Sequence, residues 1–459
     1  MDYSAANTGL WNVVIQFGVI AVVLLVAHFL RRKIKLIEKA LMPTAVLAGF
    51  LLLGIKASGI IPIDTAILEM ITYHGIAIGF IAMSLQITKR EDRDDRLVGP
   101  KSGALIVSTY LVQALVGLAI SLPLFYTIMP ELLPASGILL PMGYGQGPGQ
   151  ANNIGSTYET FGLVGGRSFG LSLAAAGYLC ACTVGIVFMN FLVRKKGVKR
   201  SEDAENISGS VTVELLADED EMSASESMDR FSVQVVLVIF AYLLTYLATL
   251  GITKLLALIS PGLANTVSSI LWGFNFIIGS LVAIIMKVTM KHLRRHKIMH
   301  HQYQNNYLLS RISGVAFDFM IVAGIASIEI SDLSGRWLPF LLMAILGGIV
   351  TFAYLMFMCK KLYPKYVYEG FFSMFGMLTG TISSGVLLLR EIDPELETPA
   401  SNNLVTGSSF GIVFGAPMLL IISYAAKSDA AALTSVGLVL VYLAVLLLFI
   451  FKAGNKKKK

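Results

Sequence analysis

Charged residues and cysteine are both scarce in this chain. Only 14% of its 459 residues are Asp, Glu, Lys or Arg, whereas 55% are hydrophobic, and the mean hydropathy is +0.73. These values exclude a soluble globular domain and indicate a polytopic membrane protein. The three cysteines, Cys180, Cys182 and Cys359, lie inside apolar stretches. We therefore expect small core residues there rather than disulfides or metal ligands.

Motifs for enzymatic chemistry are also missing. The chain has no Walker glycine loop, no Asp-rich magnesium motif and no histidine pair inside an apolar stretch, so we predict neither an enzyme nor a cofactor. Four of the seven formal net positive charges come from the terminal run Lys456–Lys459. That run indicates an anchor beside anionic lipid, and nothing favours nucleic-acid binding.

Long apolar stretches dominate the remaining sequence. A bilayer core needs about twenty apolar residues per helix, and eleven windows meet this length. The first has no basic residues before it, so we predict a retained span rather than a signal peptide. The windows lie near residues 10–30, 41–61, 68–87, 102–128, 168–193, 231–250, 264–286, 309–330, 338–359, 403–425 and 431–451.

Basic residues collect in alternate loops. The loops after the odd-numbered windows contain RRKIKLIEK, TKREDRDDRLVGPK, RKKGVKR, KHLRRHK and KKLYPK, whereas those after the even-numbered windows are nearly free of Lys and Arg. The positive-inside rule then predicts an outside N-terminus and a cytoplasmic C-terminus. We expect a multi-pass protein of the plasma (inner) membrane.

Two glycine-rich segments interrupt this series of spans. Residues 137–159 read GILLPMGYGQGPGQANNIGSTYE and residues 370–391 read GFFSMFGMLTGTISSGVLLLRE, and at an offset of 233 three glycines coincide. Each segment is too polar to span and too apolar for a free loop. Irregular backbone at membrane depth is tolerated only where protein or a watery cavity satisfies it. We predict two re-entrant hairpins, entering from the outside and from the cytoplasm respectively.

Further matches indicate two inverted-topology repeats of five helices, each with one hairpin. GVAFDF at 314–319 is similar to GIAIGF at 75–80, and the span after each hairpin contains Ser-Phe-Gly, at 168–170 and at 409–411. The predicted fold is thus an all-α polytopic membrane protein of about 11 transmembrane helices, the last without a counterpart. Its predicted parts are an N-terminal repeat (1–193), an acidic cytoplasmic linker (194–230), a C-terminal repeat (231–425), and an extra span with a Lys-rich tail (426–459).

The hairpins hold the candidate binding residues. Paired broken helices in corresponding halves point to the substrate site of a secondary transporter, because half-helix N-termini attract anions while freed carbonyls coordinate cations. The alternative is close helix packing through small residues. The candidate substrate-binding residues are Gly143, Tyr144, Gly145, Gln146, Gly147, Gln150, Asn152, Asn153, Thr379, Gly380, Thr381, Ser383, Ser384 and Arg167.

Asp318 is the clearest ionisable residue inside a predicted span, and such residues are functional candidates by default. It is a candidate sodium ligand or proton carrier, with Asn152 and Thr381 as further ion-coupling candidates; an ion pair with Arg311 is the structural alternative. Arg167 either faces a substrate carboxylate or snorkels to the interface. The histidines at 292, 296 and 300 recur every four residues, which is compatible with a metal clip or with a basic interfacial helix.

The order of spans, the stretch RRKIKLIEKALMP, the glycine-rich first hairpin and FGLVGG at 161–166 resemble the bacterial sodium/glutamate symporter family over residues 10–425. The resemblance implies two inverted five-helix repeats with re-entrant hairpins, sodium-coupled glutamate uptake and a homodimer. Where the family has a Gly-Gly-His-Gly-Thr run, this chain has MGYGQG at 142–147.

We therefore expect sodium-coupled symport of glutamate or a related acidic amino acid or carboxylate by alternating access. The expected partners are this small molecule, sodium and the lipid bilayer. A proton-coupled transporter of a different organic anion or amino acid is the alternative, and an ion channel a remote one.

Overall fold

The protein is an all-α polytopic membrane protein. The computed structural model describes residues 2–35, 42–87, 97–196, 227–259, 268, 271–273, 275–299, 301–393 and 398–452. Within these ranges no β-strand is found, and ten helices are long and apolar enough to cross a membrane. They are α1 (Thr8–Lys33), α4 (Thr65–Leu85), α5 (Val98–Thr127), α8 (Gly166–Lys196), α9 (Ser227–Ile259), α11 (Asn275–Arg295), α12 (Asn306–Ala326), α13 (Trp337–Leu362), α16 (Ala400–Ala425) and α17 (Asp429–Lys452).

The predicted spans agree with these helices except at two places. The second window, 41–61, holds the 15-residue helix α3 (Thr44–Ser58), which begins after Pro43 and ends at Gly59 in a left-handed conformation. Proline fits a helix start and left-handed glycine a helix end, so this helix is shorter than expected. The seventh window, 264–286, begins outside the described residues, and α11 extends nine residues beyond its end.

The chain forms two compact units. The hairpin unit comprises Met1–Met70, Glu91–Ser208 and Ile321–Lys459, and the second unit comprises Ile71–Arg90 and Gly209–Met320. Helix α4 passes from one unit to the other after Met70, and α12 does so after Met320. Each unit therefore contains residues from both halves of the sequence. The predicted division of the chain into repeats stays a prediction.

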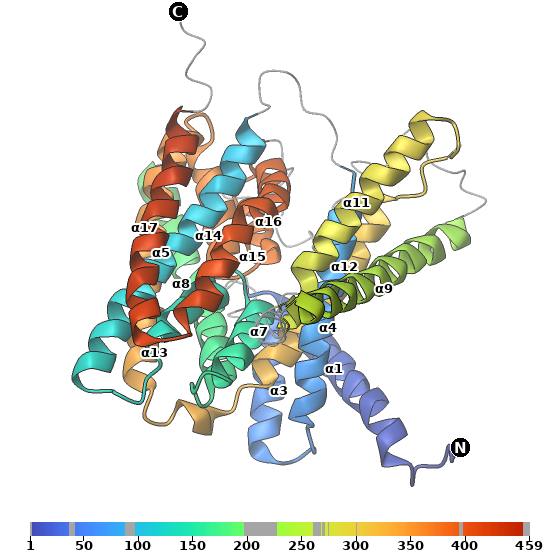
Figure 1. The fold of residues 1–459 in the computed structure, drawn as a ribbon, viewed down its shortest axis with the longest axis horizontal. Helices are drawn as coiled ribbons and strands as arrows, with labels where there is room; N and C mark the ends of the chain where they lie inside the picture. The colour runs from blue at the N-terminus through green and yellow to red at the C-terminus, as the bar shows by residue number, and fades with distance from the viewer. Residues whose placement is uncertain are drawn as a thin grey trace, which may run out of the picture. The chain divides into compact units, whose positions relative to one another are not determined.

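Helix α5 is the centre of the hairpin unit. It is apolar on all sides, and most of its residues from Ser102 to Leu122 are buried, as expected of a helix surrounded by protein. Helices α13, α16 and α17 pack around it (Figure 1). The contact with η1 (Pro134–Ile138) is very close: a Cβ placed on Gly117 would lie 1.9 Å from the carbonyl oxygen of Gly137. Only glycine fits at this crossing.

The second unit contains α9, α11 and most of α4 and α12. Its core includes Ile81, Val238, Ala283 and Leu309. The repeated motifs pack against each other here, since a Cβ on Gly79 would overlap the Phe317 ring at 2.3 Å. In this motif, Gly79 therefore serves close helix packing.

Large apolar side chains cover the outer faces of the long helices. Val236 on α9, Ile349 on α13 and Val441 on α17 are 63%, 59% and 65% exposed. Contiguous exposed apolar surface on membrane-length helices is expected where lipid replaces water. A bilayer environment accounts for these faces.

The described helices follow the same order in both halves. Four long or medium helices are followed by a hairpin of two short helices and then by a long helix: α1, α3, α4, α5, α6, α7 and α8 in the first half, and α9, α11, α12, α13, α14, α15 and α16 in the second. Helix α17 has no counterpart in this order. The acidic stretch 197–226 and the lysine run lie outside the described residues.

Candidate functional site: two broken hairpins

The first glycine segment is a hairpin of two short helices. Helix α6 (Leu139–Tyr144) ends at Gly145, and α7 (Pro148–Glu159) begins after Gly147. Gly147 has a φ of +86°, which L side chains rarely adopt. Pro148 occupies the first turn of α7, where its missing N–H costs nothing. The sequence Gly-Gln-Gly-Pro thus accounts for the break.

The second glycine segment is built in the same way. Helix α14 (Val367–Thr379) ends at Gly380, and α15 (Ile382–Arg390) begins after Thr381 in an extended conformation. A Cβ on Gly380 would lie 2.9 Å from the Ser384 hydroxyl and 3.0 Å from the Gly376 carbonyl oxygen. The absence of a side chain lets α14 and α15 approach each other at the turn.

An aromatic cluster fixes the second hairpin. Within it, Phe188 of α8 and Phe352 of α13 lie with their ring centroids 4.9 Å apart, edge to face. This arrangement suits the quadrupoles of aromatic rings. The cluster joins α8, α13 and α14 and consists of Phe188, Phe352, Phe371, Phe372 and Phe375. These ring contacts hold α14 against α8 and α13.

The two breaks meet inside the hairpin unit. A Cβ placed on Gly147 would lie 3.6 Å from the carbonyl oxygen of Gly380 and 3.6 Å from the methyl group of Thr381. Helix α8 passes both, because a Cβ on Gly177 would lie 2.4 Å from the Thr379 carbonyl oxygen and 3.3 Å from the Tyr144 Cα. Residues more than 200 positions apart in the sequence thus form one site.

The site combines helix ends of both signs. The N-termini of α7 and α15 carry amide groups without helical partners and a partial positive charge, whereas the C-termini of α6 and α14 carry carbonyl oxygens and a partial negative charge. Such a place can bind the carboxylate of a ligand and a cation side by side.

Several buried side-chain oxygens near the breaks have no hydrogen-bond partner among the described residues. They are Oε1 of Gln150, Oδ1 of Asn152, Oγ1 of Thr381 and Oγ of Ser384. A buried polar group without a partner costs about 1–3 kcal/mol, so these atoms call for a ligand, an ion or water. Amide and hydroxyl oxygens are ligands of hard cations.

Gln113 is a further residue near the first break that was not among the residues predicted from the sequence. This residue is 1% exposed in the middle of α5, and its Nε2 donates to Thr351 Oγ1 and to the Leu378 carbonyl oxygen, both at 2.9 Å. Its Oε1 has no partner among the described residues, and a Cβ on Gly145 would lie 2.8 Å from it. Gln113 thus joins α5, α13 and α14 and presents an oxygen to the first break. In the sequence, Gln113 stands out as the single side-chain amide within the apolar window 102–128.

Other predicted residues of the hairpins have packing contacts. A Cβ on Gly143 would collide with backbone atoms of Gly170 and Ala174 on α8. The buried Tyr144 donates its hydroxyl to the Ala344 carbonyl oxygen on α13. Thr379 donates its hydroxyl to the Phe375 carbonyl oxygen within α14 at 2.7 Å.

The remaining predicted hairpin residues are placed as follows. Asn153 is buried on α7, and Gln146 is half-buried between the α6 and α7 helices. The side chain of Ser383 lies outside the described part of the structure.

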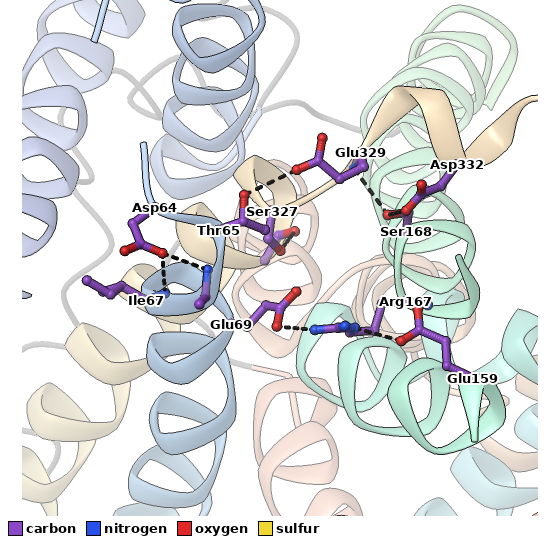
Figure 2. A network of polar contacts seen from close by, with 12 residues as sticks. Asp64, Thr65, Ile67, Glu69, Glu159, Arg167, Ser168, Ser327, Glu329 and Asp332 are labelled. Carbon is purple, nitrogen blue, oxygen red and sulfur yellow. Dashed lines mark hydrogen bonds and ion pairs between the residues drawn. The ribbon is translucent and has the colours of Figure 1, made fainter. Parts of the chain in front are cut away.

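Arg167 is in the first turn of α8, beside the C-terminal end of α7 and away from the break at Gly147. It belongs to a separate polar network. Its guanidinium pairs with Glu69 of α4 and with Glu159 at the end of α7, the latter at 3.1 Å (Figure 2). Its backbone N–H also donates to Glu159. Two carboxylates thus compensate the one positive charge, which leaves Arg167 no excess charge for a substrate anion.

The same network continues on neighbouring elements. Lys56 of α3 pairs with Glu329 at 2.6 Å, and Thr65 donates its hydroxyl to the same carboxylate. Ser168 of α8 donates to Asp332 in η5 (Ile330–Leu333) and accepts from the Glu329 N–H (Figure 2). Polar contacts therefore tie α3 and the start of α4 to the base of the first hairpin.

Asp318 lies in the second unit, in the middle of α12. It is exposed and makes no hydrogen bond or ion pair with any described residue. Arg311 does not pair with it; its guanidinium lies over the Tyr307 ring, 5.0 Å from the centroid. Gly314, one turn before Asp318, also faces open space. The ion pair between Arg311 and Asp318, which was the structural alternative, is therefore not formed.

The histidines at and just after the end of α11 do not form a metal site among the described residues. The rings of His292 and His296 lie 4.4 Å apart, but no group of three metal-binding side chains is found in the described ranges, and the third histidine of the pattern, at position 300, lies outside them.

Comparison with known proteins gives no further guidance, because no family model and no curated protein matches the chain.

Proposed function

We propose that the chain is a secondary active transporter that carries an acidic amino acid or a related carboxylate together with sodium across the plasma membrane by alternating access. The meeting of two broken hairpins beside α8 is the observation that carries the proposal. Broken helices of this kind supply unpaired amides and carbonyls for a substrate and its coupling ion. The family resemblance implies the same activity.

In this proposal the N-terminal and C-terminal helix ends bind different ligands. The amide groups that begin α7 and α15 bind the substrate carboxylate. Sodium binds among the unpartnered oxygens of Asn152, Thr381 and Gln113 and the carbonyl groups that end α6 and α14. Binding one ion of each sign at adjacent positions couples their affinities, which is what symport requires.

Proton coupling is the second candidate, and Asp318 is the observation that favours it. A carboxylate at the centre of a bilayer is costly, so one without a partner among the described residues is suited to carry a proton or a cation. A channel is less consistent with the chain, since filters usually repeat one loop around an axis through identical subunits. A homodimer stays a prediction from the resemblance.

The deciding experiment measures uptake of labelled glutamate, aspartate and dicarboxylates into proteoliposomes. An inward sodium gradient should drive accumulation, and a proton gradient without sodium should not. Accumulation driven by protons alone would transfer the proposal to the second candidate. Equal entry with and without any gradient would indicate a channel, and no entry of any acidic solute would overturn the proposal.

A further inference from the structure

A polar cluster joins three helices of the second unit. At its centre is Tyr242 of α9, whose hydroxyl lies 2.6 Å from Nδ1 of His74 on α4 and accepts from Nδ2 of Asn275 at 3.2 Å. Asn275 is the first residue of α11. Beside these residues, Tyr73 donates its hydroxyl to the Trp272 carbonyl oxygen at 2.7 Å. Three helices thus meet at one histidine side chain.

Ring contacts fix the orientation of this histidine. The His74 ring packs edge to face on Tyr73, with the centroids 5.1 Å apart, and its centroid lies 5.9 Å from that of Tyr242. Edge-to-face contacts of this kind are favourable for aromatic rings. The His74 side chain is exposed, whereas Asn275 is only 3% exposed. The cluster therefore connects a group on the surface of the unit to a buried one.

The hydrogen bonds of the cluster have a direction when His74 is neutral. A tyrosine hydroxyl has one proton to donate and can also accept. Because Tyr242 accepts from the amide group of Asn275, its own proton is available for Nδ1 of His74. The imidazole then carries its proton on Nε2. A neutral His74 thus completes a chain of two hydrogen bonds that runs from α11 through α9 to α4.

The side-chain oxygen of Asn275 is an acceptor outside this chain. It is buried, and it has no hydrogen-bond partner among the described residues. If Nδ1 of His74 is protonated, it donates to Tyr242, and the Tyr242 hydroxyl needs another acceptor for its own proton. Half a turn of the Asn275 amide presents Oδ1 to that hydroxyl. The acceptor that the reversed chain requires is therefore present.

The titratable groups that face His74 are tyrosines. Tyr73 lies next to it on α4, and Tyr242 reaches it from α9, whereas α11 contributes only the uncharged amide of Asn275. The charged residue of α11 that contacts α4 is Lys287, which donates to the Gln86 carbonyl oxygen just after α4 ends. No formal charge of α9 or α11 is therefore recorded at His74 within the described ranges.

Helix α12 also packs against α4. A Cβ placed on Gly75 would lie 3.1 Å from the Ala316 carbonyl oxygen. Of the two ionisable residues nearest on α12, Arg311 lies over the Tyr307 ring and Asp318 makes no ion pair with a described residue. The hydrogen-bond chain is thus the feature of the described structure that can respond to a proton on His74.

The predicted orientation gives His74 access to protons from outside. It lies six residues into the predicted span 68–87, which at 1.5 Å per residue is about 9 Å from the outer end. Tyr246 and Trp272 pack together beside the cluster, with ring centroids 5.5 Å apart. Tyrosine and tryptophan are enriched where a membrane meets water.

We propose that His74, Tyr242 and Asn275 form a proton-binding site in the second unit. An N–H bond forms at Nδ1 of His74, and no covalent bond breaks. The imidazolium donates to Tyr242, and the Tyr242 hydroxyl donates to Asn275. The external pH thereby sets the direction of the hydrogen bonds that join α4, α9 and α11. The site needs neither the substrate nor the coupling ion of the hairpins.

The test is a pH titration of the full-length protein in lipid nanodiscs, followed by nuclear magnetic resonance of nitrogen-labelled histidine and asparagine side chains. The signals are assigned by their loss in His74→Gln and Asn275→Ala. Between pH 4 and 8 the His74 ring nitrogens and the Asn275 amide should shift with one common midpoint. A His74 ring that does not titrate in this range, or an Asn275 amide that does not shift with it, would overturn the site.

Two tyrosine variants separate the hydrogen-bond chain from the effect of charge through space. Tyr242→Phe keeps the ring and removes the hydroxyl, so His74 should still titrate while the shift of Asn275 is lost. Tyr246→Phe removes a hydroxyl one turn further along α9 and should leave both shifts as in the wild type. If Asn275 shifts equally in the Tyr242→Phe variant, the chain does not reverse and the proposal is wrong.

Discussion

Two threonines on the second hairpin differ in how their hydroxyls are used. The hydroxyl of Thr381 has no partner among the described residues, whereas that of Thr379 donates to the Phe375 carbonyl oxygen. We predict that Thr381→Val weakens binding of substrate or sodium about 10- to 100-fold, because a hydrogen bond to a charged group contributes about 1.5–3 kcal/mol. Calorimetric titration with glutamate and sodium measures this loss.

Thr379→Val is the matched control, since it removes the same hydroxyl two residues away. It should leave both affinities within about twofold, because only a bond inside α14 is lost. If the two variants weaken binding equally, the hydroxyl of Thr381 does not contact a ligand.

Asp318 carries a carboxyl group that has no hydrogen-bond or ion-pair partner among the described residues. We predict that Asp318→Asn reduces the dependence of uptake on the coupling cation, because an amide neither ionises nor attracts a cation as a carboxylate does. Uptake rates in proteoliposomes across a range of sodium concentrations and pH values measure the dependence. Asp318→Glu, which keeps the charge, should retain it. Wild-type behaviour of the Asn variant would assign Asp318 a structural role.

At the scale of elements, the crossing of α5 and η1 depends on two glycines. We predict that Gly137→Ala lowers the free energy of unfolding by about 1–3 kcal/mol or more, because the added Cβ would lie 2.1 Å from the Gly117 carbonyl carbon. Thermal unfolding in detergent measures the loss. The control is Gly437→Ala on α17, where no atom lies within 4 Å; a similar loss there would contradict the packing argument.

The network at the base of the first hairpin connects α4 to α7 and α8 through Arg167. Removing this guanidinium leaves Glu69 and Glu159 without compensation. We predict that Arg167→Gln destabilises the protein and that adding Glu69→Gln costs less than in the wild type. The coupling should be about 0.5–1 kcal/mol, since both side chains are about a third exposed and solvent screens the pair.

A double-mutant cycle by thermal unfolding gives this coupling. Arg336→Gln serves as the control, because its guanidinium donates to the Asp332 backbone carbonyl and should show no coupling to Glu69. A coupling of zero between Arg167 and Glu69 would reduce the contact to an ordinary surface pair.

At the scale of the whole molecule, the predicted orientation in the bilayer determines which loops are accessible from outside. We predict that a cysteine at Val164, after α7, reacts with an impermeant reagent from outside, and that one at Lys365, before α14, reacts only from the cytoplasm. Both positions are exposed, and Cys180, Cys182 and Cys359 would first be replaced. Equal access from one side would contradict the inverted topology.

Much of the fold follows from local sequence, whereas the site does not. Twenty apolar residues in a row predict a span by themselves, and Gly147 with Pro148 predicts a helix break. The contact between Gly147 and Thr381 depends on packing between distant segments, which no local pattern encodes. The pairing of Arg167 with Glu69 and the position of Gln113 were unforeseen for the same reason.

The meeting of the two breaks also has a consequence for biosynthesis. A ribosome releases Gly147 more than 200 residues before Thr381, and until then the first tip has no counterpart to contact. Neither half of the polypeptide alone contains both pairs of helix ends. Insertion of the first five predicted spans therefore yields a membrane-embedded intermediate that lacks the second break, and the proposed binding site is complete only after the last third of the chain has been inserted and packed.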